Sequence, residues 1–199
     1  MTNPTAAGRA APTQRRAHER VDAILDAAAS LLDAGGFAAV TTTAIAATAG
    51  TSVGAIYRYF ADSQAVLRAL AARNVKRYWD DLDARPPHGT GREFLADVMA
   101  RYVDFARSEP GFAVIHFGQL LDDGSRDVAH GVARRLEAFM MRGGITPSDE
   151  LSLDLEIAAT MSSALMEFAF ALDPRGDQRV IDRTIELSLT LLSRHATTD

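Results

Sequence analysis

Apolar residues recur at steps of three and four along most of the chain, and this spacing constrains the fold more than any other feature. The first clear run of them is Val21, Ile24, Leu25, Ala28, Leu31 and Leu32. Such spacing gathers apolar side chains on one face of an α-helix. The alternation of a β-hairpin is not evident in any segment. The sequence therefore predicts an all-α fold.

Glycine and proline clusters divide this helical pattern into separate elements. Helices are expected over about 17–34, 41–49, 52–60, 62–85, 92–107, 127–142, 147–172 and 177–194, with a short apolar segment over 112–121. Residues 1–14 are rich in Ala, Thr, Pro and Gly and lack an apolar face, so they are expected to be a disordered tail. The rest divides into a small domain over residues 15–62 and a larger one over 63–199.

Charge and composition narrow the class of protein. The net charge is -5, but residues 1–60 hold five Arg against four acidic residues, which leaves room for a local basic face. The absence of cysteine excludes disulfides and cysteine-based zinc sites. Neither a signal peptide nor an apolar stretch of about 18 residues is evident. We therefore expect a cytoplasmic protein with no membrane partner.

The segment from Thr41 to Phe60 has the spacing of a helix-turn-helix. Two short helices that cross steeply need a small residue at the crossing, which Ala46 supplies. Gly50, four residues later, suits a tight turn with a positive φ, and Ile56 is expected to return to the core beside Ile45. An ordinary helical hairpin has similar spacing, so this pattern alone leaves both interpretations open.

The residues after the turn favour DNA binding. Gly54 lies inside a predicted helix, where glycine costs about 1 kcal/mol relative to alanine. That cost is easier to explain if a large surface must approach closely there. The run Tyr57-Arg58-Tyr59 supplies hydroxyl and guanidinium groups of the kind that contact phosphates.

Over residues 17–67 the sequence resembles the tetracycline-repressor (TetR) family of bacterial regulators. The matching features are an initial amphipathic helix, Gly35-Gly36-Phe37, the threonines before Ile45-Ala46, Ala49-Gly50, Ser52, Gly54, Tyr57, Phe60 and Leu67. The resemblance implies a homodimer whose first three helices bind double-stranded DNA at a palindromic operator. It also implies that the remaining helices enclose a small-molecule pocket, with the last two forming the dimer interface. The wide apolar arc of the last helix agrees with burial on two sides.

Positions carried over from the family define the expected DNA-binding residues. They are Arg15, Arg16, Thr41, Thr42, Thr43, Thr51, Ser52, Val53, Gly54, Ala55, Tyr57, Arg58 and Tyr59. For Arg15 and Arg16 a solvated terminal charge is an equal alternative. The chain departs from the family at Val53, Ala55 and Ser63, where polar or charged residues are frequent, and this favours fewer phosphate contacts.

The larger domain is rich in Phe and Met, with few polar groups among them. The candidate ligand-binding residues are Trp79, Met99, Tyr102, Phe105, Phe112, His116, Phe139, Met161, Leu165 and Phe168. Each alone would be unremarkable in a helical core, but together they suit an apolar cavity for an apolar or aromatic effector. Tyr102 and His116 are its candidate polar contacts.

Two other classes of function were weighed against a transcriptional regulator. For an enzyme, no pair of histidines has metal-ligand spacing on one helix face, and neither a nucleophile elbow nor a glycine-rich phosphate loop is present. We therefore expect no catalytic residues, no metal and no cofactor. A protein-interaction module remains as the alternative, although Gly54 and the Tyr-Arg-Tyr run are harder to explain on that interpretation. By analogy with the family we expect repression.

Overall fold

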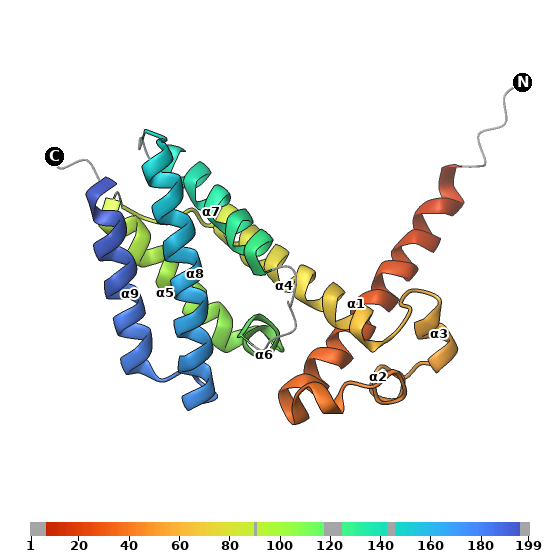
Figure 1. Ribbon diagram of the computed structural model, residues 1–199. Coiled ribbons are helices and arrows are strands. Elements are labelled where there is room, and N and C mark those ends of the chain that lie inside the picture. Colours follow the sequence, from red (N-terminus) through yellow and green to blue (C-terminus); the bar gives the residue numbers. More distant parts are fainter. Residues whose placement is uncertain (1–6, 90, 118–124, 143–145, 196–199) are drawn as a thin grey trace, which may run out of the picture. The chain divides into compact units, whose positions relative to one another are not determined.

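The structure is a computed structural model that describes residues 7–89, 91–117, 125–142 and 146–195. Within these ranges every regular element is a helix, which confirms the all-α prediction (Figure 1). The helices are α1 (Ala7–Ala39), α2 (Thr42–Thr48), α3 (Val53–Tyr57), α4 (Ser63–Ala84), α5 (Gly91–Ser108), α6 (Phe112–Phe117), α7 (Ser125–Arg142), α8 (Asp149–Leu172) and α9 (Gln178–Leu192), followed by a 3₁₀ turn (Ser193–His195). The predicted helices therefore exist, and their ends differ by a few residues in most cases.

Two boundaries differ from the sequence-based expectation. Helix α1 begins at Ala7, so the disordered tail expected through residue 14 is wrong for residues 7–14. Alanine, the best helix former, lets this segment continue α1. The chain divides into two compact units, Met1–Asn74 and Val75–Asp199, so the boundary falls inside α4 rather than before it.

The N-terminal unit has a continuous apolar core. The fully buried side chains of Ile24, Leu32, Ile45, Ile56 and Leu67 come from all four helices of the unit. An ion pair adds a tie between α1 and α4, because Arg73 Nη1 lies 2.7 Å from Asp26 Oδ1. The helix-turn-helix is thus supported on two sides by longer helices.

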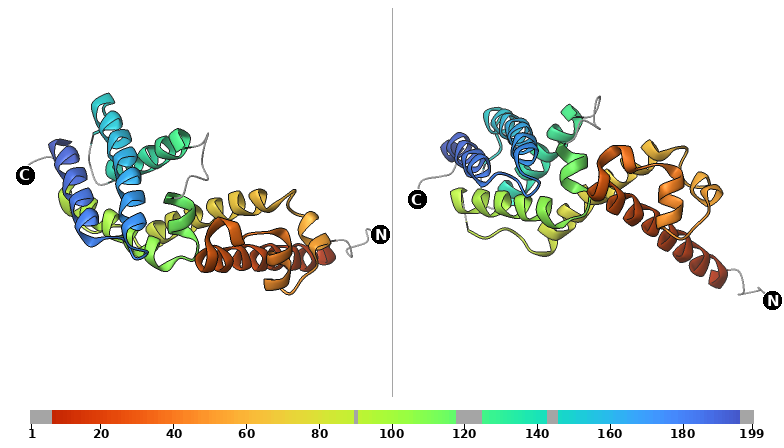
Figure 2. Two further views of the ribbon diagram at one scale, coloured as in Figure 1. Left: turned by 60° about the horizontal axis from the view of Figure 1, so that its bottom comes forward. Right: turned by 90° about the horizontal axis from the view of Figure 1, so that it is seen from below.

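In the C-terminal unit, α8 is the helix around which the others pack. It contacts α6, α7 and α9, and two further views show α8 and α9 side by side (Figure 2). Leu151 and Leu155 of α8 are fully buried and pack in one cluster with Leu82, Met140 and Leu189. A buried carboxylate in the first half of α8, that of Asp154, lies 2.6 Å from His195 Nε2 and pairs with Arg194.

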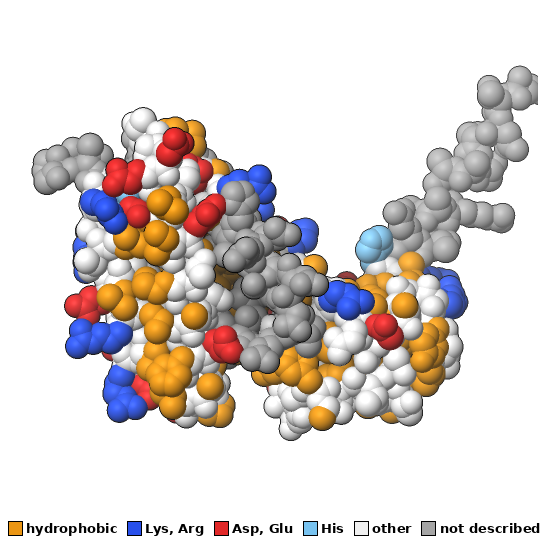
Figure 3. Space-filling view, in the orientation of Figure 1, with side chains coloured by type: hydrophobic (Ala, Val, Ile, Leu, Met, Phe, Trp, Pro, Cys, Tyr) orange, Lys and Arg blue, Asp and Glu red, His pale blue; other side chains and the backbone are white. Residues whose placement is uncertain are grey.

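One face of α8 stays exposed although it is apolar. Leu153, Ile157, Phe168 and Leu172 are between 45% and 57% exposed, and Leu187 of α9 is 49% exposed. They form part of a band of hydrophobic side chains along α8, bordered by charged residues (Figure 3). In length and composition, α8 alone among the described helices would suit a membrane span. Its buried and exposed faces account for that apolar composition without one.

The turn between α8 and α9 depends on a glycine. Gly176 has a φ of +79°, a region that disfavours residues with a side chain. A Cβ atom at this position would lie 2.8 Å from Ile181 Cδ1 and 3.1 Å from Phe170 Cε2. The turn is closed by a hydrogen bond of 2.7 Å from the Gly176 amide to the Asp173 carbonyl oxygen.

Replacing Gly176 by alanine is expected to lower the free energy of unfolding by about 1–3 kcal/mol, the usual cost of a strained backbone position. Chemical denaturation at one fixed protein concentration measures the change. Gly54→Ala is the matched control, because the nearest atom to a Cβ there is Ser52 Oγ at 4.0 Å. Equal stability of the wild type and the Gly176→Ala variant would contradict this account of the turn.

Candidate nucleic-acid interface

Helix α2 is fixed in place by its first residues. Thr41 is the N-cap, and its side-chain oxygen accepts a hydrogen bond of 3.1 Å from the Ala44 amide. Ile45 and Ala46 are buried, whereas Thr41 and Thr43 are exposed and Thr42 is partly exposed. The apolar side of α2 therefore packs inward and leaves its threonines toward solvent.

The turn between α2 and α3 has the geometry that the spacing predicted. Gly50 has a φ of +61°, and the Thr51 amide donates to the Ala46 carbonyl oxygen at 2.9 Å. Ser52 then caps α3, accepting a hydrogen bond of 3.2 Å from the Ala55 amide. Ile56 is fully buried, as expected. The turn is thus followed by a very short helix, α3, in which Ile56 is the buried residue.

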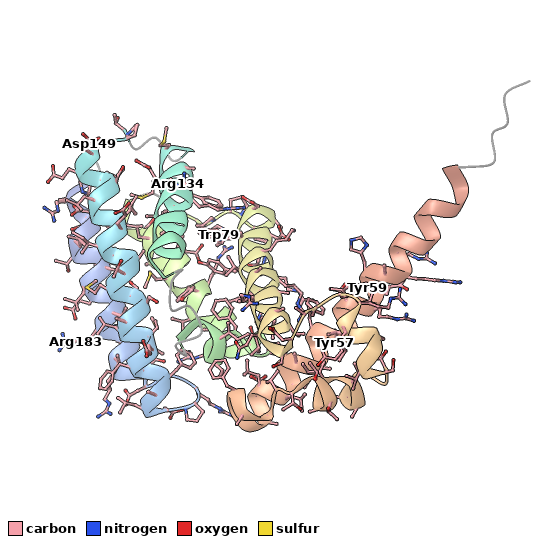
Figure 4. All side chains as sticks on the ribbon, turned by 45° about the vertical axis from the view of Figure 1, so that its right-hand side comes forward. Tyr57, Tyr59, Trp79, Arg134, Asp149 and Arg183 are labelled. Carbon is pink, nitrogen blue, oxygen red and sulfur yellow. The ribbon has the colours of Figure 1, made fainter. Side chains whose placement is uncertain are left out.

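The polar-aromatic run at the end of α3 is exposed. Tyr57 is 56% exposed, and Arg58 lies with its guanidinium carbon 5.6 Å from the centre of the Tyr59 ring. Tyr57 and Tyr59 are labelled in Figure 4. Among the described residues Arg58 forms no ion pair with a carboxylate, and its guanidinium contacts the Tyr59 ring instead. A cation held this way is available to a phosphate or a base edge.

The glycine at position 54 is better explained by an interface than by packing within the subunit. It is exposed, and a Cβ built on it would meet only Ser52 Oγ, at 4.0 Å. No neighbour within the described chain therefore requires a glycine here. The free-energy cost of a glycine in this helix is therefore better explained by a molecule that approaches from outside the subunit.

The N-terminal half of α1 carries the two predicted arginines. Arg15 Nε lies 3.4 Å from Glu19 Oε1, so Arg15 is occupied by an intrahelical ion pair. Arg16 lines a hollow that α1 shares with the turn at residues 49–51. Arg20 lines the same hollow and was not singled out from the sequence. The four-residue step between Arg16 and Arg20 is the signal that could have revealed it.

Most of the candidate ligand-binding residues meet in one aromatic cluster of the C-terminal unit. The ring centres of Tyr102 and Phe112 are 5.9 Å apart, and those of Phe105 and Phe112 are 5.0 Å apart. Trp79 stacks on Phe139 at 6.4 Å (Trp79 is labelled in Figure 4). Met99 is partly buried and packs against the same region, whereas Met161 and Leu165 of α8 are partly buried.

Two hydroxyl groups lie within this apolar surrounding. Burial raises the pKa of Tyr78 well above its ordinary value, and its hydroxyl donates to the Val98 carbonyl oxygen at 3.4 Å. Burial raises the pKa of Tyr102 in the same way, with the neighbouring Tyr78 adding to the shift. Both phenols therefore remain protonated donors.

Phe168 and His116, like Met161 and Leu165, are not placed in this cluster. Phe168 is 54% exposed, so the expectation that it lines the interior of its own subunit is wrong. It lies on the exposed apolar face of α8, because a helix with apolar residues on more than one side has no unique inward face. The side chain of His116 lies outside the described residues.

Comparison with known proteins bears directly on this architecture. The model of the tetR family of bacterial regulatory proteins matches residues 24–70, and the model of the tetracyclin repressor-like C-terminal domain matches residues 90–196. The chain belongs to the TetR family. Its helix-turn-helix is accordingly a DNA-binding element, and the protein is a transcriptional regulator.

Individual relatives of this TetR-family regulator cover nearly its whole length. A TetR-family regulator from Streptomyces coelicolor is 32% identical and has a TM-score of 0.72, over 88% of this chain and 99% of that one. The transcriptional repressor KstR of Rhodococcus jostii (strain RHA1) is 27% identical over 87% of this chain and 82% of its own length. FadR from Bacillus subtilis, solved in complex with stearoyl-CoA, has a TM-score of 0.60 at 17% identity, over 86% and 97% of the two chains.

In the part of the chain that the structure describes, no three His, Cys, Asp or Glu side chains gather to hold a metal ion. The Asp154–His195 contact lies in the first half of α8 and, together with the Arg194–Asp154 ion pair, holds the C-terminal turn in place. The residues that stand out chemically are therefore those of the helix-turn-helix and of the aromatic cluster.

Proposed function

We propose that this regulator is a homodimeric repressor that binds a palindromic operator and is released by an apolar or aromatic small molecule. The observation that carries the DNA-binding part is the exposed surface of α3. There, Tyr57 and Arg58 project with no carboxylate partner among the described residues, next to a glycine that internal packing does not require.

The proposed DNA contacts come from both helices of the motif. Exposed or partly exposed side chains occur at every expected position within the helix-turn-helix: Thr41, Thr42, Thr43, Thr51, Ser52, Val53, Ala55, Tyr57, Arg58 and Tyr59, with Gly54 proposed as the point of closest approach. Residues at the start of a recognition helix meet base edges in the major groove. Arg58 is the strongest candidate for a guanine or a phosphate.

The proposed dimer interface is the exposed apolar face of α8 together with Leu187 of α9. Large exposed apolar patches with a polar rim mark sites of association. A two-fold axis brings the same face of both subunits together, so a continuous stripe along one helix pair is self-complementary. The two α8–α9 pairs then form a four-helix bundle. This accounts for Phe168, which its own subunit leaves exposed.

The proposed effector site is the aromatic cluster around Trp79, Tyr102 and Phe112. Its rings offer apolar contacts, and the protonated Tyr78 and Tyr102 hydroxyls place two polar groups among them, of which the Tyr78 hydroxyl donates to the Val98 carbonyl oxygen. FadR from Bacillus subtilis, which shares this fold, holds a molecule with a long acyl chain, so the fold accommodates apolar ligands. We propose the same broad class for this chain and leave the identity of the compound open.

Release from DNA would follow from a shift between two forms of the dimer. In the DNA-binding form the recognition helices match successive major grooves, about 34–36 Å apart. A ligand favours the other form only by the difference between its affinities for the two. A compound that saturates the protein and leaves DNA affinity unchanged would not be its effector.

A gel-shift titration against the DNA that flanks the coding region tests this function. At about 150 mM salt with excess competitor, we expect a discrete complex in the range of specific affinities, roughly 10⁻⁸–10⁻¹¹ M. Arg58→Ala should weaken it tenfold or more, since a bidentate base contact is worth about 1–3 kcal/mol. Arg134→Ala, an exposed arginine of α7, is the control and should bind as the wild type does.

The effector is tested by the fluorescence of Trp79, the single tryptophan of the chain. A compound that enters the cluster should change this emission at the same concentrations that release labelled DNA. Release without any change at Trp79 would contradict this location of the site. If neither flanking nor randomly selected DNA binds, the chain is better explained as a protein-interaction module.

A further inference from the structure

A hollow of about 330 Å³ lies in the N-terminal unit between α1 and the turn that precedes α3. Its α1 side is formed by residues three and four apart, Arg16, Glu19, Arg20, Ala23 and Ile24, and its other side by Ala49, Gly50 and Thr51. Such spacing places the α1 residues on one helix face. Ile24 is fully buried whereas Arg16 and Arg20 are exposed, so the guanidinium groups lie on the open side.

The charges around this hollow leave an excess of two cations. Glu19 is its one acidic residue, and Arg15 lies 3.4 Å from the Glu19 carboxylate and compensates it. Within the described part of the chain, no ion pair or hydrogen bond engages the side chain of Arg16 or Arg20. The hollow is therefore suited to an anion.

The position of the hollow indicates which anion it meets. Thr51 belongs to its wall, and Ser52, the next residue, caps the start of α3. The start of a recognition helix is the part that reaches the base edges, so the DNA backbone on either side of the groove passes close by. Guanidinium groups suit phosphate, because their N–H donors match its oxygens in pairs.

We propose that Arg16 and Arg20 together hold one phosphate of the DNA backbone in this hollow, an inference that rests on the proposed function. The contact anchors α1 to the strand beside the recognition helix. It sets the position of α3 in the groove and carries no base preference of its own. Arg15 takes no part, since its role is to neutralise Glu19. Of the two arginines expected from the sequence, the structure assigns the contact to Arg16 and adds Arg20.

Salt dependence of binding provides the first test, with a duplex recovered from random sequences by the wild-type protein. Arg16→Gln combined with Arg20→Gln should reduce the slope of log affinity against log salt by about 1.8 per dimer, at 0.9 for each phosphate. The preference for the selected duplex over unrelated DNA should stay unchanged. The matched control, Lys76→Gln with Asp80→Asn, removes an exposed i,i+4 ion pair of α4 outside the hollow without altering net charge and should keep the wild-type slope.

Neutral methylphosphonate linkages, introduced one at a time into the selected duplex, then locate the contact. The wild type should lose affinity at one linkage per half-site that the double Arg16/Arg20 variant does not sense. The inference would be overturned if both proteins were equally sensitive at every linkage, or if the double variant kept the wild-type salt slope, provided that the wild type binds DNA. If isothermal titration with inorganic phosphate showed loss of an anion site in the variant without such a linkage, the hollow would hold a free anion and the proposal would be wrong. Failure of the wild type to select any duplex would instead refute the proposed function, and this inference with it.

Discussion

Replacing Ile157 and Phe168 together by glutamate is expected to separate the proposed homodimer into single chains of 21.4 kDa. Both side chains lie on the exposed apolar face of α8, at 45% and 54% exposure. A two-fold interface receives every substitution twice, so four carboxylates would be buried without partners. Burying one such carboxylate costs more free energy than the apolar residue it replaces contributes to association. Light scattering coupled to gel filtration gives the mass directly.

The same variant should lose operator binding, because a palindromic site needs two recognition helices on one rigid dimer. Met141→Glu is the control, since Met141 is a comparably exposed apolar residue (48%) on α7. It should remain dimeric and bind DNA. A double Ile157/Phe168 variant that keeps the wild-type mass would show that the subunits associate through another surface.

Replacing Gly54 by alanine is expected to change folding stability and DNA affinity in opposite directions. Within the subunit the new methyl group has room, with Ser52 Oγ as its nearest atom at 4.0 Å. The free energy of unfolding should rise by up to about 1 kcal/mol, because alanine favours a helix over glycine. Affinity for the operator should fall tenfold or more, and Gly54→Leu should reduce it further. Denaturant titration and gel shift measure the two quantities.

Gly50→Ala separates this effect from ordinary damage to the motif. Gly50 has a φ of +61°, so a side chain there strains the turn and both stability and DNA binding should decline. Of the two substitutions, only Gly54→Ala should raise folding stability while it lowers DNA affinity. If Gly54→Leu left the operator affinity unchanged, the proposed close approach of DNA to Gly54 would be wrong.

The helix-turn-helix was predictable because its determinants are local. The caps at Thr41 and Ser52, the left-handed Gly50 and the buried Ile56 each depend on a few neighbouring residues. Spacing therefore determines them without knowledge of the rest of the fold. The break around Gly176 was predictable for the same reason.

Other features depend on contacts between distant segments, and the sequence did not resolve them. Phe168 was grouped with the aromatic core because periodicity cannot distinguish the two apolar sides of α8. Arg20 was not singled out, because α1 and the turn at residues 49–51 share a hollow only in the folded chain. The unit boundary after Asn74 lies within a continuous helix, where no change in composition marks it.

The central claim is that this chain reads a two-fold DNA site as a dimer. Selection from random duplexes with the wild-type protein, followed by sequencing, tests it most directly. The account predicts an enriched inverted repeat whose half-sites are spaced by about one helical turn of 10–10.5 base pairs, or a multiple of it, and whose binding is lost with Arg58→Ala. Enrichment of no sequence, or of a site without two-fold symmetry, would contradict it.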